Sequence, residues 1–423
     1  MAVTKTRTVG YGSRVKDSCM GVFVGIGLFL VGTYVIGCNE FDAKKTSDML
    51  EEVAEKVEHI DVAKRSSDNV GLLAHASADA VTTDSLVDPD FGVGFVGIKL
   101  ERTVEYYQWQ ENTHEERKDK LGGGEEIITT YTYEKKWVSQ PINSSGFEEA
   151  GHTNTVNYTT DNKTEWAKNV AFGDYKLPEF LIQSISGNED MRLNIPEANM
   201  KELNRAVANA KGVSVTTPVT ASTSDSTVQN DNYAYAHVNK NELYLGRNAN
   251  APEIGDVKIT FSCIPCKTIS VIATVTEDSF KKYKASNKKT FSKVMSGKVD
   301  QEEMLDAAES ESTMWKWLMR VGGTLAVCVG IMMMFNLLVT IAKVVPFISK
   351  IIEFGTTLIS FIIGIIWSLL VMVICWIAAR PWIIVVVIGV IAAVGFFLYK
   401  NAQTKKLKEE LAAAKTSTEE NKE

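Results

Sequence analysis

Proline, cysteine and histidine are all scarce in this chain of 423 residues, with 9, 6 and 5 copies. The few cysteines exclude a small domain held together by disulfides, and the ordinary glycine and proline content excludes a collagen-like or disordered chain. Charge is scarcer still in residues 321–399, where the charged side chains are Lys343, Lys350, Glu353 and Arg380. One membrane crossing takes about 20 apolar residues, so this block must span a membrane several times. A purely soluble enzyme is therefore excluded.

The net charge of the chain is −7, and the acidic excess falls between its two apolar regions. Domains that bind nucleic acid are usually basic, because they neutralise phosphates with lysine and arginine. The charge balance therefore argues against a nucleic-acid partner.

Two apolar regions predict the membrane segments. The shorter region holds one span, and the longer region holds three. Proline at position 381 separates the last two spans, because the residue before a proline is disfavoured in a helix. In chain order we predict an N-terminal segment at 1–19, transmembrane helix 20–38, a large domain at 39–318, transmembrane helices 321–342, 355–379 and 381–399, and a tail at 400–423.

The distribution of lysine and arginine predicts the orientation of these spans. Both residue types gather before the first span, between the second and third, and after the fourth, whereas the turn between the third and fourth has Arg380 alone. Cytoplasmic loops carry the excess of Lys and Arg. We therefore expect both termini in the cytoplasm and the domain 39–318 in a lumen, or in the periplasm of a bacterium. The predicted fold class is an α+β membrane protein with four transmembrane helices, one N-terminal and three C-terminal.

Three small residues in the first span, Gly21, Gly25 and Gly32, predict close helix packing. Gly21 and Gly25 are four residues apart, and this spacing lets another helix approach closely. The partner is either a second copy of the chain, which would make it a homo-oligomer, or another span of the same chain. The sequence leaves both open.

Alternating and periodic patterns predict the elements of the large domain. Residues 43–60 repeat apolar side chains at helical spacing, and 96–106 and 127–137 alternate as a hairpin around the glycines at 122–124. Residues 257–263 and 268–276 alternate as a second hairpin. Two short segments, near 176–183 and 197–206, look helical, and the Ser/Thr-rich stretch 213–232 predicts a loop.

Cys263 and Cys266 form the sharpest local motif, CIPC, at the turn of the second predicted hairpin. A redox-active pair needs its first thiol at a helix N-terminus, which lowers the thiol pKa. A strand-to-strand turn instead predicts a structural disulfide or two free thiols. The five scattered histidines do not complete a zinc site, so no metal is expected.

Three tripeptides match the pattern for asparagine-linked glycosylation, at Asn143, Asn157 and Asn162. No nucleophile elbow, metalloprotease helix, phosphate loop or dinucleotide fingerprint is present in the sequence. We therefore expect no catalytic residues and no cofactor, and a protein that is not an enzyme.

The chain resembles the LUMA (transmembrane protein 43) family in the order and identity of short segments along most of its length. It also shares the layout of one span, a large domain and three further spans. The segments are GVFVG at 21–25, CNE at 38–40, DPDFG at 88–92, VEYYQW at 104–109, Tyr131, Tyr133, Trp137, INS at 142–144, Phe147, Gly151, His152, PEIGDV at 252–257, Phe261, Trp317, Arg320, Gly323, Arg380 and Pro381.

The resemblance implies a multi-pass protein of the endoplasmic reticulum and inner nuclear membrane. It implies an oligomerising scaffold that organises membrane protein complexes at the nuclear envelope, with emerin- and lamin-like partners, and it carries over no catalytic residue. The Ser/Thr-rich loop, the CIPC turn and the long charged tail depart from the family pattern. In a bacterium the partners would differ, and the protein would lie in the inner membrane with a periplasmic domain.

Two alternatives to the scaffold remain open from the residues. One is an ion-conducting or transport subunit, although the spans have few charged residues in their interiors, where ion pathways usually place them. The other is a lumenal redox or ligand-binding module that uses the CIPC pair or the aromatic residues of the large domain.

Overall fold

The computed structural model describes residues 3–213, 234–344, 346–380, 382–383, 385–386, 388–401 and 403. The predicted loop 213–232 and the tail 400–423 thus lie almost wholly outside the described residues. The chain divides into two compact units. We call them the β unit, made of Met1–Arg14, Thr46–Glu311 and Ala342–Pro346, and the helical unit, made of Val15–Lys45, Ser312–Ile341 and Phe347–Glu423.

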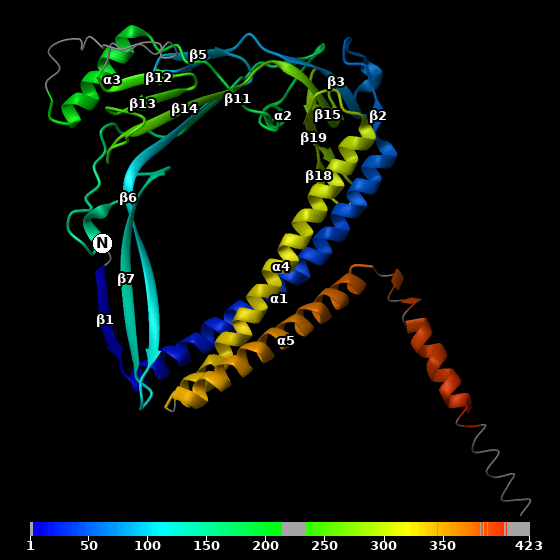
Figure 1. Ribbon diagram of the computed structural model, residues 1–423. Helices are drawn as coiled ribbons and strands as arrows, with labels where there is room; N and C mark the ends of the chain where they lie inside the picture. Colours follow the sequence, from blue (N-terminus) through cyan, green and yellow to red (C-terminus); the bar gives the residue numbers. More distant parts are fainter. Residues whose placement is uncertain are drawn as a thin grey trace, which may run out of the picture. The chain divides into compact units, whose positions relative to one another are not determined.

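Among the described residues, three helices are long and apolar enough to cross a membrane: α1 (Tyr11–Lys56), α4 (Gln301–Ala342) and α5 (Pro346–Ala378) (Figure 1). They contain the predicted spans 20–38, 321–342 and nearly all of 355–379. The predicted fourth span, 381–399, is represented among the described residues by a shorter apolar helix, Ile388–Asn401. No proline interrupts residues 11–56, so the predicted helix 43–60 is the continuation of the first span rather than a separate element.

In the part of the chain that the structure describes, the larger sheet of the β unit has eight strands, and its main path runs β1-β7-β6-β14-β13-β12, with β8 paired to β6 and β11 paired to β14. The predicted hairpin around the glycines at 122–124 is confirmed as β6 and β7, whose long antiparallel pairing is drawn in Figure 1. The strands are β1 (Val3–Val9), β6 (Lys99–Asp119), β7 (Glu125–Val138), β8 (Lys163–Trp166), β11 (Glu189–Asp190), β12 (Ala236–Asn239), β13 (Glu242–Leu245) and β14 (Val257–Ile264).

The second sheet has seven strands, and its main path runs β10-β9-β3-β15-β16, with β19 paired to β15 and β2 paired to β3. Two further strand pairs, β4 with β5 and β17 with β18, stand apart from both sheets. The strands are β2 (Glu58–His59), β3 (Leu73–Val81), β4 (Ser85–Asp88), β5 (Val93–Val96), β9 (Ala171–Phe172), β10 (Tyr175–Lys176), β15 (Lys267–Val275), β16 (Phe280–Lys281), β17 (Tyr283–Lys284), β18 (Thr290–Phe291) and β19 (Lys293–Ser296).

The second predicted hairpin is wrong, although both of its strands exist. β14 pairs with β6 and β13 in the larger sheet, whereas β15 pairs with β3 and β19 in the smaller one. Both sides of each strand are already hydrogen-bonded to other strands, so β14 and β15 cannot pair with each other. The turn at 264–266 instead carries the chain from one sheet to the other.

The two sheets share one hydrophobic core, to which Val104 and Phe261 contribute from the larger sheet and Ala76 and Val271 from the smaller. Helix α3 (Glu197–Ala210) buries one face, including Leu203, and contacts β12 and β13, whereas α2 (Glu179–Ile182) is a single turn. Both were expected from the sequence. A second, smaller core joins the last turns of α1 to the first turns of α4.

Residues 3–14 of the predicted N-terminal segment 1–19 belong to the β unit. Val3–Val9 form β1, which pairs antiparallel with β7, so that Val3 lies opposite Tyr131 and Val9 lies opposite Glu125. The buried Arg14 donates to the carbonyl oxygens of Gly123 and Gly124, at 2.8 and 3.1 Å. Hydrogen-bonded strands share one compartment, so we expect the N-terminus and this part of the hairpin on the same side of the membrane.

This pairing predicts the accessibility of two epitope tags, one at the N-terminus and one inserted at Gly122. In cells whose plasma membrane alone is permeabilised, antibodies should reach both tags or neither. A tag after the C-terminus serves as an independent reference. Accessibility of only one of the first two tags would contradict the β1–β7 pairing.

Candidate functional site in the membrane helices

Four glycines hold α1 and α4 against each other within the helical unit. Gly25 and Gly32 of α1 face Gly330 and Gly323 of α4. A Cβ atom on Gly25 would lie 2.6 Å from the carbonyl oxygen of Gly330, and one on Gly32 would lie 2.8 Å from that of Gly323. Only hydrogen fits at such distances, so the backbones approach as closely as small residues allow. We call this contact the glycine seam.

The seam includes one of the two glycines, Gly21 and Gly25, whose spacing suggested a close helix contact. Gly25 packs against another helix of the same chain, which is the second of the two partners that the sequence left open. A Cβ on Gly21 would meet nothing within 4 Å. The sequence pointed to Gly32 as well as Gly25 on α1 but missed Gly323 and Gly330 on α4, although the seven-residue spacing within each pair was a readable signal.

Polar side chains of the helical unit pair across the helices. The hydroxyl groups of Ser18 and Thr340 are 2.6 Å apart, and the indole nitrogen of Trp367 donates to Thr33 at 3.0 Å. An unpaired polar group in hydrocarbon is costly, so each pair fixes one helix against another.

The strongest of these polar contacts joins Glu40 of α1 to Arg320 of α4. Nε and Nη2 of the guanidinium donate to the two carboxylate oxygens at 2.6 and 2.8 Å. This bidentate geometry is the strongest form of the ion pair, and Glu40 is only 3% exposed. Breaking a buried pair leaves an uncompensated charge, so this contact locks the register of the two helices.

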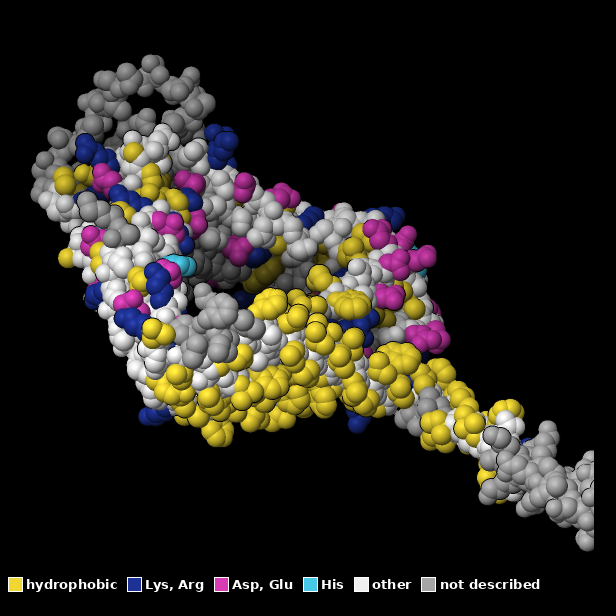
Figure 2. All heavy atoms as spheres, turned by 60° about the horizontal axis from the view of Figure 1, so that its bottom comes forward, with side chains coloured by type: hydrophobic (Ala, Val, Ile, Leu, Met, Phe, Trp, Pro, Cys, Tyr) yellow, Lys and Arg dark blue, Asp and Glu magenta, His cyan; other side chains and the backbone are white. Residues whose placement is uncertain are grey.

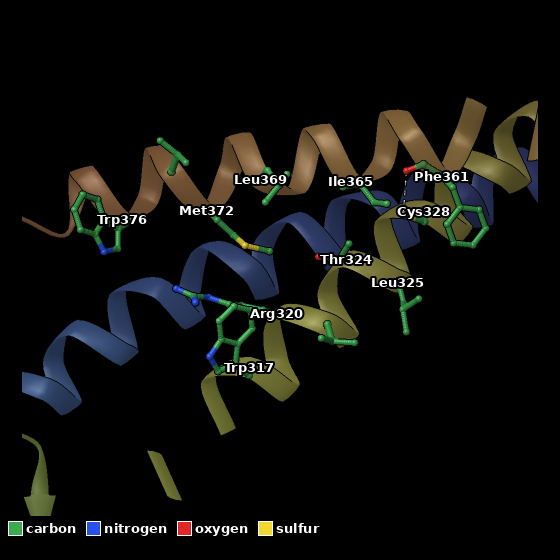
Figure 3. A pocket seen from close by; sticks show the side chains of 12 residues that line it. Trp317, Arg320, Thr324, Leu325, Cys328, Phe361, Ile365, Leu369, Met372 and Trp376 are labelled. Carbon is green, nitrogen blue, oxygen red and sulfur yellow. Dashed lines mark hydrogen bonds between the residues drawn. The ribbon is translucent and has the colours of Figure 1, made fainter. Parts of the chain in front are cut away.

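A groove of about 480 Å³ lies between α4 and α5 (Figure 3). Its two tryptophans and Arg320 gather at one end, and Cys328 and Phe361 lie at the other. Apolar side chains line the length between them. The full lining is Trp317, Arg320, Val321, Thr324, Leu325, Cys328, Phe361, Ile365, Leu369, Met372, Val373 and Trp376.

The outer faces of the helices of the helical unit are exposed and apolar. Figure 2 shows hydrophobic side chains gathered over them in a continuous band. Phe23 and Tyr34 of α1 are 71% and 72% exposed, and Ile366 of α5 is 59% exposed. Surfaces of this extent mark contact with a membrane or with other proteins.

The CIPC pair belongs to the β unit, and both of its cysteines are free thiols. Cys263 is buried at the end of β14, and burial raises the pKa of its thiol. Cys266 is exposed, with its Sγ 3.4 Å from the backbone nitrogen of Thr82. A raised pKa disfavours the reactive thiolate, so Cys263 is not set up as a nucleophile.

The three candidate glycosylation sites differ sharply in access. Asn157 is buried, and its Nδ2, the atom that would carry a glycan, donates to Asp256 at 3.1 Å. Asn143 is exposed, and its Oδ1 accepts from the backbone nitrogen of Ser145. Asn162 is also exposed, and its Oδ1 accepts from Val104. Both of these asparagines use the oxygen rather than the nitrogen in these contacts.

This difference predicts glycan occupancy when the chain is expressed in a eukaryotic cell with this part of the β unit in the lumen. Replacing Asn143 or Asn162 by Gln should each remove one glycan, seen as a step in mobility after endoglycosidase treatment. Replacing Asn157 by Gln should leave the glycan pattern unchanged. A glycan on Asn157 would show that the folded unit does not bury this side chain.

A histidine pair joins β2 to β3 near the first residues of α4. The Nδ1 atoms of His59 and His75 are 3.0 Å apart, and Nε2 of His75 contacts the carbonyl oxygen of Val299 at 2.9 Å. A carbonyl only accepts, so Nε2 of His75 carries a proton, and its Nδ1 accepts the proton of His59. Protonation of His75 would set two N–H groups against each other. Burial and the neighbouring His59 lower the pKa of His75, against the raising effect of Val299 and Asp300.

The lowered pKa of His75 predicts that acid destabilises the β unit. Below about pH 6.5, His75 binds a proton in the unfolded chain but binds it less readily in the folded chain, because its pKa is lower there. Stability should therefore fall as the pH drops from 7.5 towards 5.5. In the full chain in detergent, His75→Gln should flatten this decline in melting temperature, because glutamine still donates to Val299.

The matched control for this measurement is His114→Gln, on the exposed part of β6. It should keep the decline of the parent chain. If His75→Gln and His114→Gln lose the same stability between the two pH values, the histidine pair does not account for the acid sensitivity.

The fold and the helical seam together define a multi-pass membrane protein with a strand-rich unit between its first and second apolar helices. The chain belongs to the transmembrane protein 43 family. The model of that family, described as "Transmembrane protein 43", matches residues 106–381, well over half of the chain. The family resemblance seen in the sequence is thereby confirmed.

Curated relatives of the same description cover nearly the whole chain. "Transmembrane protein 43" of Rattus norvegicus is 26% identical over 419 residues, with 96% of each chain covered. The Mus musculus protein is 27% identical over 391 residues, with 90% of this chain and 89% of the relative covered. "Transmembrane protein 43 homolog" of Drosophila melanogaster is 25% identical over 176 residues, which is 40% of this chain and 46% of the relative. No solved structure matches the chain.

Proposed function

We propose that this protein is a membrane scaffold that organises protein complexes in the endoplasmic reticulum and inner nuclear membrane, through self-association. The proposal includes a fourth crossing at 381–399, of which helix Ile388–Asn401 is the described part, and a cytoplasmic C-terminal tail rich in lysine. Emerin- and lamin-like proteins of the nuclear envelope are its proposed partners, by family resemblance.

The observation that carries the proposal is the way polar groups pair inside the helical unit. Ser18 with Thr340, Thr33 with Trp367 and Glu40 with Arg320 each join two helices. Side chains that are hydrogen-bonded across two helices stiffen the unit. They bond to each other rather than lining a polar pathway for ions. A stiff membrane unit that carries a large β unit suits the positioning of other proteins.

Self-association is proposed through the outer face of α1, because the glycine seam is already occupied. Phe23, Leu30 and Tyr34 are all more than half exposed on this helix. Bulky apolar and aromatic side chains of this kind anchor contacts between helices when they find a complementary surface. The face is therefore the natural contact for a second copy.

Mass photometry of the purified full chain in a mild detergent tests the self-association. We expect a mass of two or more copies. A triple variant, Phe23→Ala, Leu30→Ala and Tyr34→Ala, should shift the mass to one copy, whereas a control on α5, Ile362→Ala with Ile366→Ala, should not. A single copy in the parent chain would overturn self-association.

Proximity labelling in the native cell tests the location and the partners. The labelling enzyme is fused after the C-terminus in one line and placed in the β unit in another. Enrichment of nuclear-envelope and reticulum membrane proteins over a matched membrane control supports the scaffold. Enrichment of bulk membrane proteins alone would contradict it.

The ion-conducting alternative is weaker because the polar side chains named above contact one another. Recordings from bilayers that contain the purified chain would reveal current, and a reproducible current would favour this alternative. The redox alternative rests on Cys263 and Cys266, and the raised pKa of the buried thiol speaks against it. Unchanged function in Cys263→Ser with Cys266→Ser would remove it.

A further inference from the structure

We propose that the groove between α4 and α5 binds a phospholipid of the surrounding bilayer, with its phosphate at Arg320 and Arg380 and one acyl chain along the groove. The inference concerns a ligand of the helical unit, and it stands apart from the proposed scaffold function. The argument rests on the chemistry of the two ends of the groove and on its length.

One end of the groove concentrates hydrogen-bond donors. The guanidinium of Arg320 uses Nε and Nη2 for Glu40, which leaves Nη1 for another acceptor. It lies 5.0 Å from the ring of Trp317, and the guanidinium of Arg380 lies 4.4 Å from the ring of Trp376. Figure 3 shows Trp317, Arg320 and Trp376 together at this end.

The charge of this end complements a phosphate. Glu40 neutralises Arg320. Arg380 lies over the ring of the lining residue Trp376, donates from Nη1 to its carbonyl oxygen at 3.2 Å, and adds a positive charge beside the groove. Arginine binds phosphate through several directed N–H groups, and tryptophan favours the level of the lipid head groups. A phosphodiester carries one negative charge, so it would balance the group without leaving a buried excess.

The remainder of the groove is apolar and long enough for an acyl chain. On α5 it runs from Trp376 to Phe361, and the 15 helical steps between these residues rise by about 22 Å at roughly 1.5 Å per residue. One leaflet of hydrocarbon is about 15 Å thick, half of the usual 30 Å core. A volume of about 480 Å³ also falls in the range of small-molecule sites, which is roughly 300–1,000 Å³.

The main competitor for the groove is the chain's own helix Ile388–Asn401. Its side chains are exposed along its length, and Gly389 with Ala393 gives it a small-residue face. Phospholipid is favoured because this helix has no anionic side chain to meet the two arginines, whereas a phosphate meets both. The experiment below separates the two occupants.

Native mass spectrometry of the full chain, purified from cells in mild detergent, provides the first readout. We expect phospholipid to remain bound. After delipidation, the chain is mixed with phosphatidylcholine or with diacylglycerol of the same acyl chains. Phosphatidylcholine should be retained at least threefold more, and Arg380→Gln should reduce that preference. Equal retention of both would overturn the role of the phosphate.

Two adjacent positions on α5 supply a matched pair of variants for the second readout. Ile365 lines the groove, whereas Ile366 faces outward. In vesicles with a photoactivatable phosphatidylcholine, Ile365→Trp should lower labelling of residues 361–376 at least threefold, and Ile366→Trp should leave it unchanged. Equal labelling in both would show bulk lipid only. Melting temperatures of both variants confirm that they are folded.

Cysteine cross-linking tests the competing helix directly. Thr324→Cys on the groove and Ala393→Cys on the short helix are combined in a chain whose six native cysteines are changed to alanine. We expect no cross-link within or between chains in native membranes. A disulfide within one chain would place the chain's own helix in the groove, and one between copies would place a second copy there. Either result would overturn the proposal.

Discussion

Replacing Arg102 by Ala should destabilise the β unit by about 3–5 kcal/mol, the range found when one partner of a buried ion pair is removed. Nη1 of Arg102 donates to both carboxylate oxygens of Asp88, at 2.9 and 2.7 Å, and to Asp90 at 2.8 Å. Nε donates to the carbonyl oxygen of Asp161. Arg102 is 4% exposed and Asp88 is 2% exposed, so the substitution would leave a carboxylate buried without its cation.

Denaturant unfolding of the full chain in detergent, followed by tryptophan fluorescence, measures this effect. Lys163→Ala is the matched control, because Lys163 pairs with Glu165 on the surface at 3.1 Å. Exposed pairs contribute about 0–1 kcal/mol, so the control should change little. Changing Arg102 to Met together with Asp88 to Leu should recover much of the lost stability. A loss at Arg102→Ala no larger than that of the control would contradict the buried pair.

Replacing Gly25 by Leu should separate α1 from α4 and lower the stability of the helical unit by about 1–3 kcal/mol or more, as overpacking does elsewhere. The Cβ alone would lie 2.6 Å from the carbonyl oxygen of Gly330 and 3.0 Å from the Cβ of Met333. The first of these neighbours is backbone and cannot rotate away. The helices must therefore move apart, and the hydrogen bond between Ser18 and Thr340 should be lost with them.

Gly21→Leu is the control for this prediction, because nothing lies within 4 Å of a Cβ at Gly21. Two readouts apply to the full chain: the melting temperature in detergent, and a disulfide between cysteines placed at Ser18 and Thr340. Gly25→Leu should lower both the melting temperature and the yield of disulfide, and Gly21→Leu should lower neither. Equal behaviour of the two variants would show that the seam does not hold the helices together.

Local patterns predicted most of the elements, because they depend on neighbouring residues. The alternation on each side of the glycines at 122–124 predicted the hairpin of β6 and β7, whose partners are adjacent in the chain. The same reasoning failed for β14 and β15. Their partners β6 and β3 lie far away in sequence, and alternation predicts a strand without saying which strand it joins.

The helical contacts also divide into features that local sequence predicts and features that only distant partners decide. The pattern of Gly21 and Gly25 predicted a close helix contact, but both residues fit it equally well in the sequence. The facing helix decides between them, since only Gly25 meets a backbone. Glu40 and Arg320 stand 280 positions apart, and nothing local links them. Asn157 matched the glycosylation pattern as well as Asn143 did, and burial alone distinguishes the two.

The sequence by itself determined that this is a membrane protein of the transmembrane protein 43 family, with long apolar helices on either side of a strand-rich domain. The length of an apolar segment and the alternation of a strand depend on consecutive residues, so both can be recognised without knowing the tertiary structure. Only the tertiary structure decided that the N-terminal segment is a strand of that domain. It also decided which glycines form the seam, and that the CIPC turn joins two sheets. These features depend on which distant segments pack together, and that choice is made by burial and backbone pairing over the whole chain.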